Sequence, residues 1–305
     1  MKKKLILTIV GARPQFIKAA LLSKTLQKQP NIKELILHTG QHYDNNMSKV
    51  FFKELEIPTP QINLNIKEQL QGKQTAKMLE GIEKYLIKLH PSLIIVYGDT
   101  NSTLAGALAS SKLHIPLAHI EAGLRSFNKK MPEEINRMLT DHVSDFLFAP
   151  THNAVTLLKK EGINANKIYL VGDIMFDVAL YYKNKAKLGS NILNTLKIKP
   201  KNYILTTIHR AENTDNPNIL KNIFNVILTL SKTINIVMPL HPRTKKKLKT
   251  LKIDIKKSPY LNIIEPVGYL DMVQLESHAS MILTDSGGVQ KEAYFYKVPC
   301  ITLRE

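Results

Sequence analysis

The chain has 305 residues, of which 44% are hydrophobic and 22% charged, and its formal net charge is +18. This length suits two α/β domains of ordinary size, and this composition excludes a disordered chain. No apolar run reaches the roughly 18 residues that a membrane-spanning helix needs. The single cysteine, Cys300, excludes a disulfide framework and a zinc site built on several thiolates.

Short β-branched apolar runs alternate with amphipathic segments along the whole chain. Such continuous apolar strands, separated by helices, are typical of parallel sheets that helices cover on both faces. We therefore predict an α/β fold with two Rossmann-like domains. The expected strands are residues 5–10, 34–38, 93–97, 117–120, 146–149, 168–171, 203–207, 234–239, 261–264, 281–284 and 300–303. In the expected helix 217–233, the predicted apolar stripe consists of Ile219, Ile223, Val226, Ile227 and Leu230.

The segment 181–202 loses strand character and is rich in Lys, Asn and Gly, which indicates a domain boundary. We predict an N-terminal domain over residues 1–182 and a C-terminal domain over residues 183–305. Ligands of such folds bind at the carboxyl ends of the strands, so we expect a cleft between the two domains to hold the site.

The positive charge is spread along the chain. Lysines occur in nearly every expected helix, and the densest run, at 245–247, falls on an expected solvated helix. No basic segment is interleaved with aromatic residues, as nucleic-acid-binding modules are. We expect no nucleic-acid partner and no membrane partner, although the charge should attract an anionic ligand. The apolar stretch after Met1 is too short for a signal peptide, so the expected location is the cytoplasm.

The loop after the first expected strand begins at Gly11 and is basic. A glycine turn lets a ligand approach the backbone closely, and Arg13 and Lys18 bring positive charge to the strand end. The loop is not GxGxxG, so a dinucleotide fingerprint is lacking. Taken alone, a basic loop of this kind is often only a solvated loop.

Three carboxylates lie on loops that follow expected strands: Asp99, Glu121 and Glu133. Each has a simpler explanation, because Asp99 suits the N-cap of the next helix and acids at a helix start complement the helix dipole. General acid–base chemistry, however, needs carboxylates whose environments separate their proton affinities. With Arg125 and Arg137 among them, the three together favour acid–base catalysis.

The second half of the chain offers an anion site. A Ser-Gly-Gly turn at 286–288 follows an expected strand and opens a helix, where free backbone N–H groups and the helix dipole favour a phosphate. Glu292, one turn into that helix, suits a ribose diol. A Gly-Gly turn can also be plain geometry. Two histidines follow other strands of the same half: His209 and His241.

Six motifs resemble the non-hydrolysing UDP-N-acetylglucosamine 2-epimerase family, in the family's order and across nearly the whole chain. The resemblance implies a glycosyltransferase-B-like fold, a UDP-sugar as partner, no metal, no NAD or other cofactor, and a homodimer. The motifs are Gly-Ala-Arg-Pro-Gln-Phe-Ile-Lys (11–18), Thr-Gly-Gln-His-Tyr-Asp (39–44), Tyr-Gly-Asp-Thr-Asn-Ser-Thr-Leu (97–104), His-Ile-Glu-Ala-Gly-Leu-Arg (119–125), Met-Pro-Glu-Glu-Ile-Asn-Arg (131–137) and Thr-Asp-Ser-Gly-Gly-Val-Gln (284–290).

The implied activity is the interconversion of UDP-GlcNAc and UDP-ManNAc for surface polysaccharide biosynthesis. UDP leaves by anti elimination to give a 2-acetamidoglucal, and it adds back after C2 is protonated on the opposite face. Which carboxylate is the acid and which the base stays open. Carried over by motif, the catalytic residues are Asp99, Glu121, Glu133 and His209. The substrate-binding residues are Arg13, Lys18, His42, Arg137, His241, Ser286, Gly287, Gly288 and Glu292.

Two departures from the family pattern bear on this expectation. Ala12 and Gln15 stand where many members have Thr and Glu, and the loop around 126–131 is similar to the branch that acts on UDP-2,3-diacetamido-2,3-dideoxy-glucuronate. The chain also ends at Glu305, where the family continues, so we expect a truncated C-terminal domain. An uncovered sheet exposes apolar surface, which predicts lower stability than in a full-length relative and leaves an inactive UDP-binding fragment as an alternative.

Three rival functions remain at this point. A retaining glycosyltransferase shares the two-domain fold but needs an acceptor, and a hydrolysing 2-epimerase releases free sugar. A nucleic-acid-binding protein predicts an affinity for duplex DNA that falls steeply with salt. The three carboxylates and the motifs favour the non-hydrolysing epimerase over all three.

Overall fold

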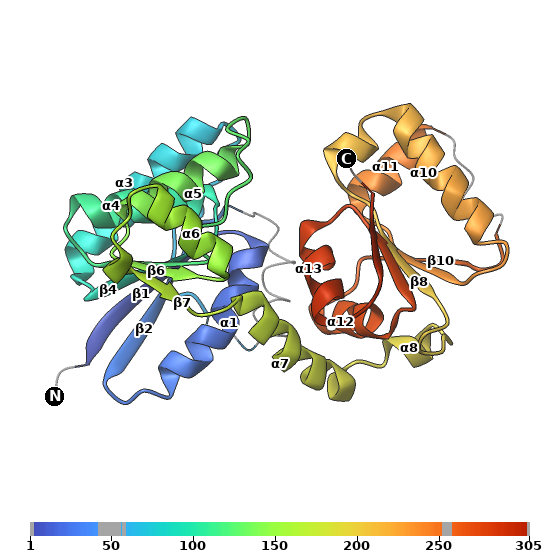
Figure 1. Cartoon of the computed structure of the whole chain (residues 1–305), viewed down its shortest axis with the longest axis horizontal. Helices are drawn as coiled ribbons and strands as arrows, with labels where there is room; N and C mark the ends of the chain where they lie inside the picture. The colour runs from blue at the N-terminus through green and yellow to red at the C-terminus, as the bar shows by residue number, and fades with distance from the viewer. Residues whose placement is uncertain (1–2, 42–55, 57–58, 252–257, 304–305) are drawn as a thin grey trace. The chain divides into compact units, whose positions relative to one another are not determined.

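The computed structural model describes residues 3–41, 56, 59–251 and 258–303, and it divides the chain into two compact units, Met1–Val178 and Ala179–Glu305 (Figure 1). Each unit is described by itself. The division falls within helix α7 (Ile174–Gly189), and the predicted boundary after residue 182 lies in the same helix. The cleft between the domains stays a prediction.

The N-terminal unit is built on a parallel sheet of seven strands in the order β3-β2-β1-β4-β5-β6-β7. Every strand predicted in this part is present and differs only at its ends. The structure adds β3, which was not predicted. The strands are β1 (Lys4–Val10), β2 (Ile32–His38), β3 (Ile62–Asn63), β4 (Leu93–Tyr97), β5 (Leu117–Ile120), β6 (Phe146–Ala149) and β7 (Ile168–Leu170).

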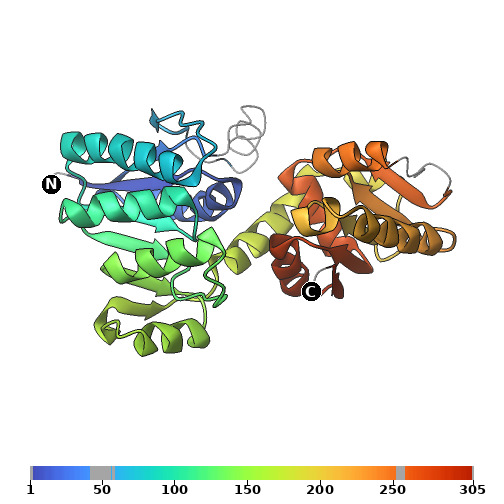
Figure 2. The ribbon, with the colours of Figure 1, turned by 90° about the horizontal axis from the view of Figure 1, so that it is seen from above.

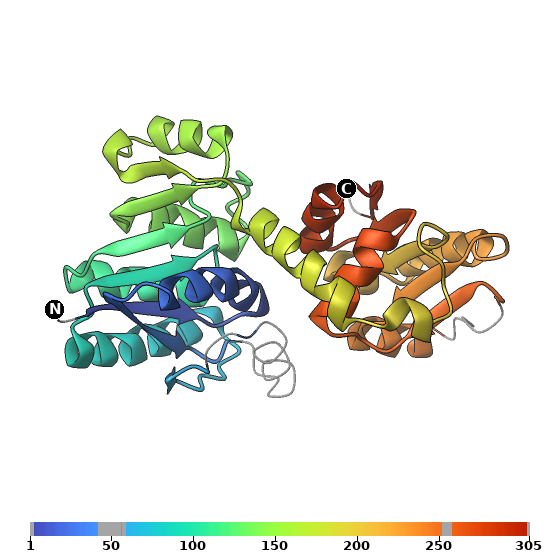
Figure 3. The same cartoon turned by 90° about the horizontal axis from the view of Figure 1, so that it is seen from below.

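Helices cover both faces of this sheet. Helix α1 lies on one face (Figure 3), and α3, α4 and α5 lie side by side on the other, followed by α6 (Figure 2). The core between α3 and the sheet includes Met78 and Ile82, which pack with Leu7, Ile94 and Val96. The helices of this unit are α1 (Arg13–Gln27), α3 (Gln71–Leu89), α4 (Asn101–Lys112), α5 (Pro132–Val143), α6 (His152–Lys160) and a 3₁₀ turn, η1 (Ala165–Lys167).

The C-terminal unit has a second parallel sheet, in the order β10-β9-β8-β11-β12. All five strands were predicted. The strands are β8 (Ile204–Thr207), β9 (Ile236–Pro239), β10 (Leu261–Ile264), β11 (Met281–Thr284) and β12 (Cys300–Thr302). The helices are α8 (Ile192–Thr195), α9 (Ala211–Thr214), α10 (Pro217–Leu230), α11 (Pro242–Thr250), α12 (Tyr269–His278) and α13 (Gly287–Phe295), besides the C-terminal part of α7.

The buried face of α10 differs from the predicted stripe. Leu220, Phe224 and Ile227 are buried, whereas Ile219 is 41% and Val226 58% exposed. Apolar residues surround much of this helix, so its sequence contains two overlapping stripes. From the predicted stripe the core takes Ile227, with Ile223 and Leu230 partly buried against it, and from the other it takes Leu220 and Phe224. None of the described helices is long and apolar enough to cross a membrane.

Candidate active site

The carboxyl ends of β1, β4 and β5 meet at one edge of the N-terminal sheet. β4 pairs with β1 on one side and with β5 on the other, and the strand order reverses between β1 and β4. Ligands of open α/β sheets bind at such a switch point. The structure brings three predicted residues together at this edge: Lys18 from α1, Asp99 after β4 and Glu121 after β5.

Lys18 and Glu121 form an ion pair, and their side chains are only 10% and 8% exposed. Glu121 adopts a positive φ of 72°, a region that residues other than glycine rarely occupy and that is often found at functional sites. Gly98, itself at φ 63°, lies against the pair: a Cβ there would stand 3.2 Å from Lys18 Nζ and 3.4 Å from Glu121 Oε2. Lys18 is therefore paired with the carboxylate of Glu121, and the pair lies beside the loop that carries Asp99.

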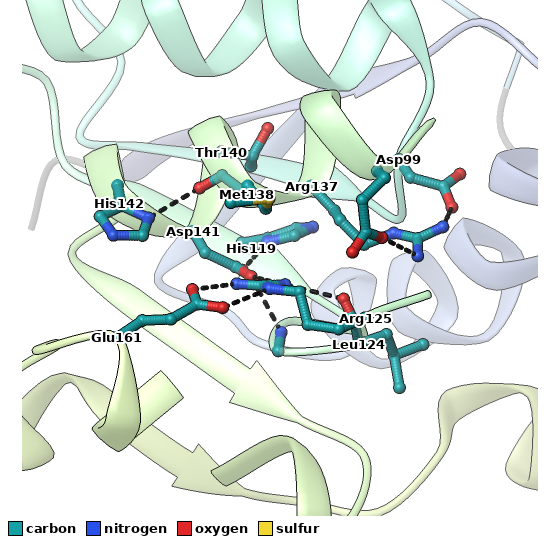
Figure 4. Close-up of polar contacts among 12 residues, drawn as sticks. Asp99, His119, Leu124, Arg125, Arg137, Met138, Thr140, Asp141, His142 and Glu161 are labelled. Carbon is teal, nitrogen blue, oxygen red and sulfur yellow. Dashed lines mark hydrogen bonds and ion pairs between the residues drawn. The ribbon is translucent and has the colours of Figure 1, made fainter. Parts of the chain in front are cut away.

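Asp99 is held by Arg137, whose Nη2 donates to Asp99 Oδ2 at 2.7 Å (Figure 4). Asp99 is not the cap of the following helix. Thr100 is the N-cap of α4, and its hydroxyl accepts from Thr103 N. The simpler explanation of Asp99 as a capping residue is therefore wrong. Its carboxylate lies after the end of β4 and is paired with Arg137.

The two acids at the start of α5 have different surroundings. Glu133 is exposed, and its carboxylate makes no hydrogen bond or ion pair with a described residue. Glu134 is only 1% exposed, and its carboxylate accepts from the backbone N–H groups of Ser126 and Phe127 and from Arg137 Nη1. Burial acts to raise the pKa of Glu134, but these donors outweigh it and hold the pKa below its usual value. Glu134 thus organises the loop before α5, and Glu133 is available for contact with a ligand.

A network of ionisable side chains joins the end of β5 to α5 and the end of α6, and it includes His119, Asp141, Arg125 and Glu161 (Figure 4). His119 Nδ1 lies 2.7 Å from Asp141 Oδ1, and His119 Nε2 lies 2.7 Å from the carbonyl oxygen of Gly98. Arg125 pairs with Asp141 at 2.7 Å and binds Glu161 through two hydrogen bonds. Burial acts to raise the pKa of Asp141, but the His119 and Arg125 charges hold it below its usual value. Arg125, which was expected among the three carboxylates, is therefore an internal ion-pair residue bound to Asp141 and Glu161.

Gln15 connects the loop after β1 to the end of β4. Its Oε1 accepts from Gly11 N at 2.8 Å and Ala12 N at 3.0 Å, and its Nε2 donates to Tyr97 O and Thr103 Oγ1, both at 2.9 Å. Gln15 and Ala12 are both buried. Of the two positions where this loop departs from the family pattern, Gln15 therefore ties the loop to the end of β4, and Ala12 is buried within the loop.

In the C-terminal unit, the loops after β8 and β11 meet in the same way. These strands are paired neighbours, and the strand order reverses between them. Asp285, directly after β11, is fully buried, and its carboxylate accepts from His209 N, Arg210 N and Asn213 Nδ2 at 3.0 to 3.1 Å. His209 Nδ1 lies 3.3 Å from Asp285 Oδ1, which orients the imidazole. The predicted histidine is thus held at the switch point of this sheet.

The predicted Ser-Gly-Gly turn opens α13. Ser286 is the N-cap, and its hydroxyl accepts from Val289 N at 3.5 Å. Neither glycine has a positive φ. A Cβ on Gly287 would meet nothing nearer than Arg210 Nη2 at 3.7 Å, and one on Gly288 nothing nearer than Ser286 Oγ at 3.9 Å. The fold therefore does not require glycine at either position, and Arg210 brings positive charge to the helix start.

The other predicted residues of this unit are placed as follows. The His209 and His241 rings lie 5.4 Å apart between centroids, and His241 is also the N-cap of α11, accepting from Arg243 N. Glu292, in α13, is largely buried and accepts from Tyr269 Oη at 3.1 Å. His209, His241 and the turn at 286–288 therefore belong to the loops at the carboxyl edge of one sheet.

Some predicted features lie outside what the structure describes. His42 is outside the described residues, and so is the side chain of Arg13, although its backbone begins α1. Within the described ranges, no group of three or more His, Cys, Asp or Glu side chains is placed to hold a metal ion.

The buried residues of these sites that received no role in the sequence analysis include His119 and Asp285. Both stand within the recognised motifs, and the available signal was an ionisable residue in or directly after an apolar strand. A buried ionisable side chain needs partners, which for a strand residue come from the neighbouring strand end or the covering helix.

Comparison with known proteins identifies the family. Residues 24–305 match the family model described as UDP-N-acetylglucosamine 2-epimerase. A UDP-N-acetylglucosamine 2-epimerase homolog of Methanococcus maripaludis is 57% identical over 302 residues, which are 98% of this chain and 83% of that protein. The UDP-2,3-diacetamido-2,3-dideoxy-D-glucuronate 2-epimerase of Pseudomonas aeruginosa is 50% identical over 303 residues, with the same shares covered.

The crystal structure of Methanocaldococcus jannaschii UDP-GlcNAc 2-epimerase in complex with UDP-GlcNAc and UDP is similar to this chain with a TM-score of 0.88 at 49% identity. The match covers 99% of this chain and 84% of that one. These likenesses confirm the predicted glycosyltransferase-B-like fold class. The chain belongs to the UDP-N-acetylglucosamine 2-epimerase family, whose members are isomerases.

Proposed function

We propose that this protein is a non-hydrolysing epimerase that inverts C2 of a UDP-2-acetamido sugar, with UDP-GlcNAc and UDP-ManNAc as the pair it interconverts. The observation that carries the proposal is the cluster at the β4 and β5 ends, where Arg137 pairs with Asp99 and Lys18 pairs with Glu121 beside Gly98. Two carboxylates suit a reaction in which a proton leaves one face of a carbon and returns to the other.

The proposed reaction needs no further reactant. The bond between C1 and the UDP oxygen breaks with its electron pair on UDP, a carboxylate removes the C2 proton, and a C1–C2 double bond forms. A proton then returns to C2 on the opposite face, and UDP rebuilds its bond to C1. We propose Asp99, Glu121 and Glu133 as the proton-transfer groups, with acid and base roles open, and Lys18 and Arg137 as the cations that hold two of them.

The C-terminal unit is proposed to bind the nucleotide. The glycines at 287 and 288, which the fold does not require, leave the start of α13 open to close approach by a diphosphate, and Arg210 lies beside the turn. His209 would stabilise the negative charge that builds on UDP as it leaves. Glu292 is proposed to bind the ribose, and His241 to complete the phosphate site. Arg13 and His42 stay predicted substrate contacts.

A second substrate, UDP-2,3-diacetamido-2,3-dideoxy-D-glucuronate, is supported by the 50% identity to the Pseudomonas aeruginosa enzyme of that name. A Methanocaldococcus jannaschii UDP-N-acetylglucosamine 2-epimerase is also 50% identical, so overall identity favours neither substrate. The Gln15 side chain is engaged inside the protein, so its departure from the family pattern is weak support for a direct contact with a uronate.

The test is proton NMR of the purified protein with UDP-GlcNAc in D2O. Deuterium at C2 together with UDP-ManNAc signals would establish the reaction and the substrate. A second sample contains UDP-2,3-diacetamido-2,3-dideoxy-D-glucuronate in place of UDP-GlcNAc. Exchange in that sample alone would identify the diacetamido-glucuronate as the substrate. UDP binding with no exchange in either sample would favour a UDP-binding protein without epimerase activity, and release of free sugar would favour a hydrolysing enzyme.

We also propose the remaining expectations, of which the first two follow from the family resemblance and the others from the composition of the sequence. These are a homodimer, a role in surface polysaccharide biosynthesis, a cytoplasmic location, and two domains over residues 1–182 and 183–305. Sedimentation velocity at several protein concentrations tests the dimer, because a monomer at every concentration would contradict it.

A further inference from the structure

His119 lies near the end of β5, two residues before the proposed catalytic Glu121, and it is fully buried. Its two ring nitrogens face different elements. Nδ1 faces Asp141 Oδ1 of α5 at 2.7 Å, and Nε2 faces the carbonyl oxygen of Gly98, after β4, at 2.7 Å. A buried histidine is often only a satisfied core residue, but here one partner is the peptide that precedes Asp99.

Both contacts require His119 to donate. The Gly98 carbonyl can only accept, so Nε2 carries a proton. The Asp141 carboxylate also accepts from Gly123 N at 3.1 Å and pairs with Arg125 at 2.7 Å, as an ionised group does. Nδ1 therefore donates to it as well. With both ring nitrogens donating, as in an imidazolium, His119 and Arg125 are the two cations of this network, and the carboxylates of Asp141 and Glu161 offset their charges.

The contact with Gly98 bears on the position of Asp99. Gly98 has a φ of 63°, and a glycine peptide can rotate over a wide range unless it is held. His119 holds the carbonyl before Asp99, while Asn136 Nδ2 donates to the carbonyl of Asp99 itself at 2.9 Å. Arg137 holds the carboxylate at 2.7 Å. The peptides on both sides of Asp99 are therefore fixed by side chains from β5 and α5.

We propose that His119 is a positioning residue: by donating to the Gly98 carbonyl from a buried ion pair with Asp141, it fixes the peptide that places the Asp99 carboxylate for proton transfer. The inference rests on the proposed epimerase function. A displacement of about 1 Å at a reacting group can cost roughly 100-fold in rate, so the loss belongs in kcat more than in KM.

The experiment compares His119→Leu, which has no donor, with His119→Gln, whose amide can still donate to the Gly98 carbonyl. His142→Gln is the matched control, since His142 is an exposed residue of α5 whose ring nitrogen bonds to the Met138 carbonyl of its own helix. We expect kcat to fall about 100-fold in His119→Leu and clearly less in His119→Gln, with KM within about threefold of the unvaried protein. The control should keep its kcat and its melting temperature.

The outcome that overturns the inference is equal loss of kcat in both His119 variants in step with loss of thermal stability, because that is what a purely structural residue would show. A folded His119→Leu variant with unchanged kcat would also overturn it.

A second measurement serves if neither variant folds. In ¹⁵N-histidine-labelled unvaried protein, NMR should show one imidazole with slowly exchanging protons on both nitrogens, and a single ring proton at every buried histidine would overturn the inference. This signal does not depend on turnover. Absence of turnover by the unvaried protein with either UDP-sugar would count against the proposed function, and the ring-proton result would still decide the His119 geometry.

Discussion

The carboxylate of Asp285 accepts the backbone N–H of His209, with the His209 nitrogen 3.0 Å from Asp285 Oδ2, and it also faces His209 Nδ1 across 3.3 Å. The two residues are far apart in the chain and follow strands that are neighbours in the C-terminal sheet. One buried acid after β11 therefore sets both the backbone and the ring of the histidine after β8. This contact joins the histidine loop to the Ser-Gly-Gly turn.

Replacing that acid should disturb both stability and nucleotide binding. In Asp285→Asn, an NH₂ group would replace one of the oxygens that face the N–H groups of His209 and Arg210. Leaving buried donors unpaired costs about 1–3 kcal/mol, and we expect a loss of that order in urea unfolding, together with weaker UDP binding. Glu265→Gln, at an exposed ion pair with Lys245, is the control and should change stability by less than about 0.5 kcal/mol. Equal stability of the two variants would contradict the prediction.

The glycines of the turn allow a cleaner separation of binding from folding. A Cβ on Gly287 or Gly288 would meet no atom of a described residue closer than 3.7 Å. An alanine at either position should therefore not lower the melting temperature, and it should raise the free energy of unfolding by at most about 1 kcal/mol. UDP affinity measured by calorimetry should fall at least about tenfold, because the methyl group occupies the space that a phosphate would approach.

Gly72→Ala in α3, which belongs to the N-terminal unit, is the control for this pair, because a Cβ at Gly72 would meet no atom of a described residue within 4 Å. Its UDP affinity should equal that of the unvaried protein. UDP affinity that is also unchanged in both turn variants would show that this turn does not bind the diphosphate.

Substitution of the two acids at the start of α5 should affect different properties: turnover in the case of Glu133, and stability in the case of Glu134. Glu133 is exposed, so Glu133→Gln should lower kcat by about 10²- to 10⁴-fold, with unchanged unfolding in urea. Glu134 is buried and accepts from Ser126, Phe127 and Arg137, so Glu134→Gln should lower stability by about 1–3 kcal/mol. Turnover by NMR and urea unfolding measure the two effects. A Glu133→Gln variant with full turnover would remove Glu133 from the proposed mechanism.

Glu34 should make stability depend on pH. Burial raises the pKa of Glu34 above its usual value, more than the hydroxyls of Thr8 and Ser23 lower it. A raised folded-state pKa disfavours the ionised form in the folded protein, so stability is lost as pH rises from 4.5, the ordinary value, through the folded-state pKa. The advantage of Glu34→Gln in the free energy of unfolding should therefore grow with pH over that window.

Urea unfolding of the unvaried protein and Glu34→Gln at several pH values measures this difference. If the new amide itself changes the free energy of unfolding, that change is the same at every pH. It therefore does not affect how the difference between the two proteins varies with pH. Glu80→Gln is the control, because Glu80 is exposed and its pKa is lowered by Lys84, so its difference should not grow in the same direction. A flat difference for Glu34→Gln would contradict the prediction.

The sequence by itself determined the fold class and the strand positions. Runs such as Leu-Ile-Ile-Val-Tyr in β4 are short, continuous, apolar and rich in β-branched residues, which is typical of a strand buried on both faces. The strand that escaped prediction, β3, has only two residues, Ile62 and Asn63, and is too short to carry a pattern. The motifs also placed Lys18, Asp99 and Glu121 in segments that follow expected strands. Because the loops after parallel strands lie at one edge of a sheet, this placement put the three residues at that edge.

The tertiary structure alone decided which charged residue does what. It made Thr100 the cap and left Asp99 to Arg137, it buried Glu134 and exposed Glu133, and it gave His119 two acceptors. Each of these outcomes depends on a partner from another strand end or helix, which local sequence does not specify. A carboxylate becomes structural or available according to the donors that the sheet order brings within about 3 Å of it, and that order is set by the packing of the whole unit.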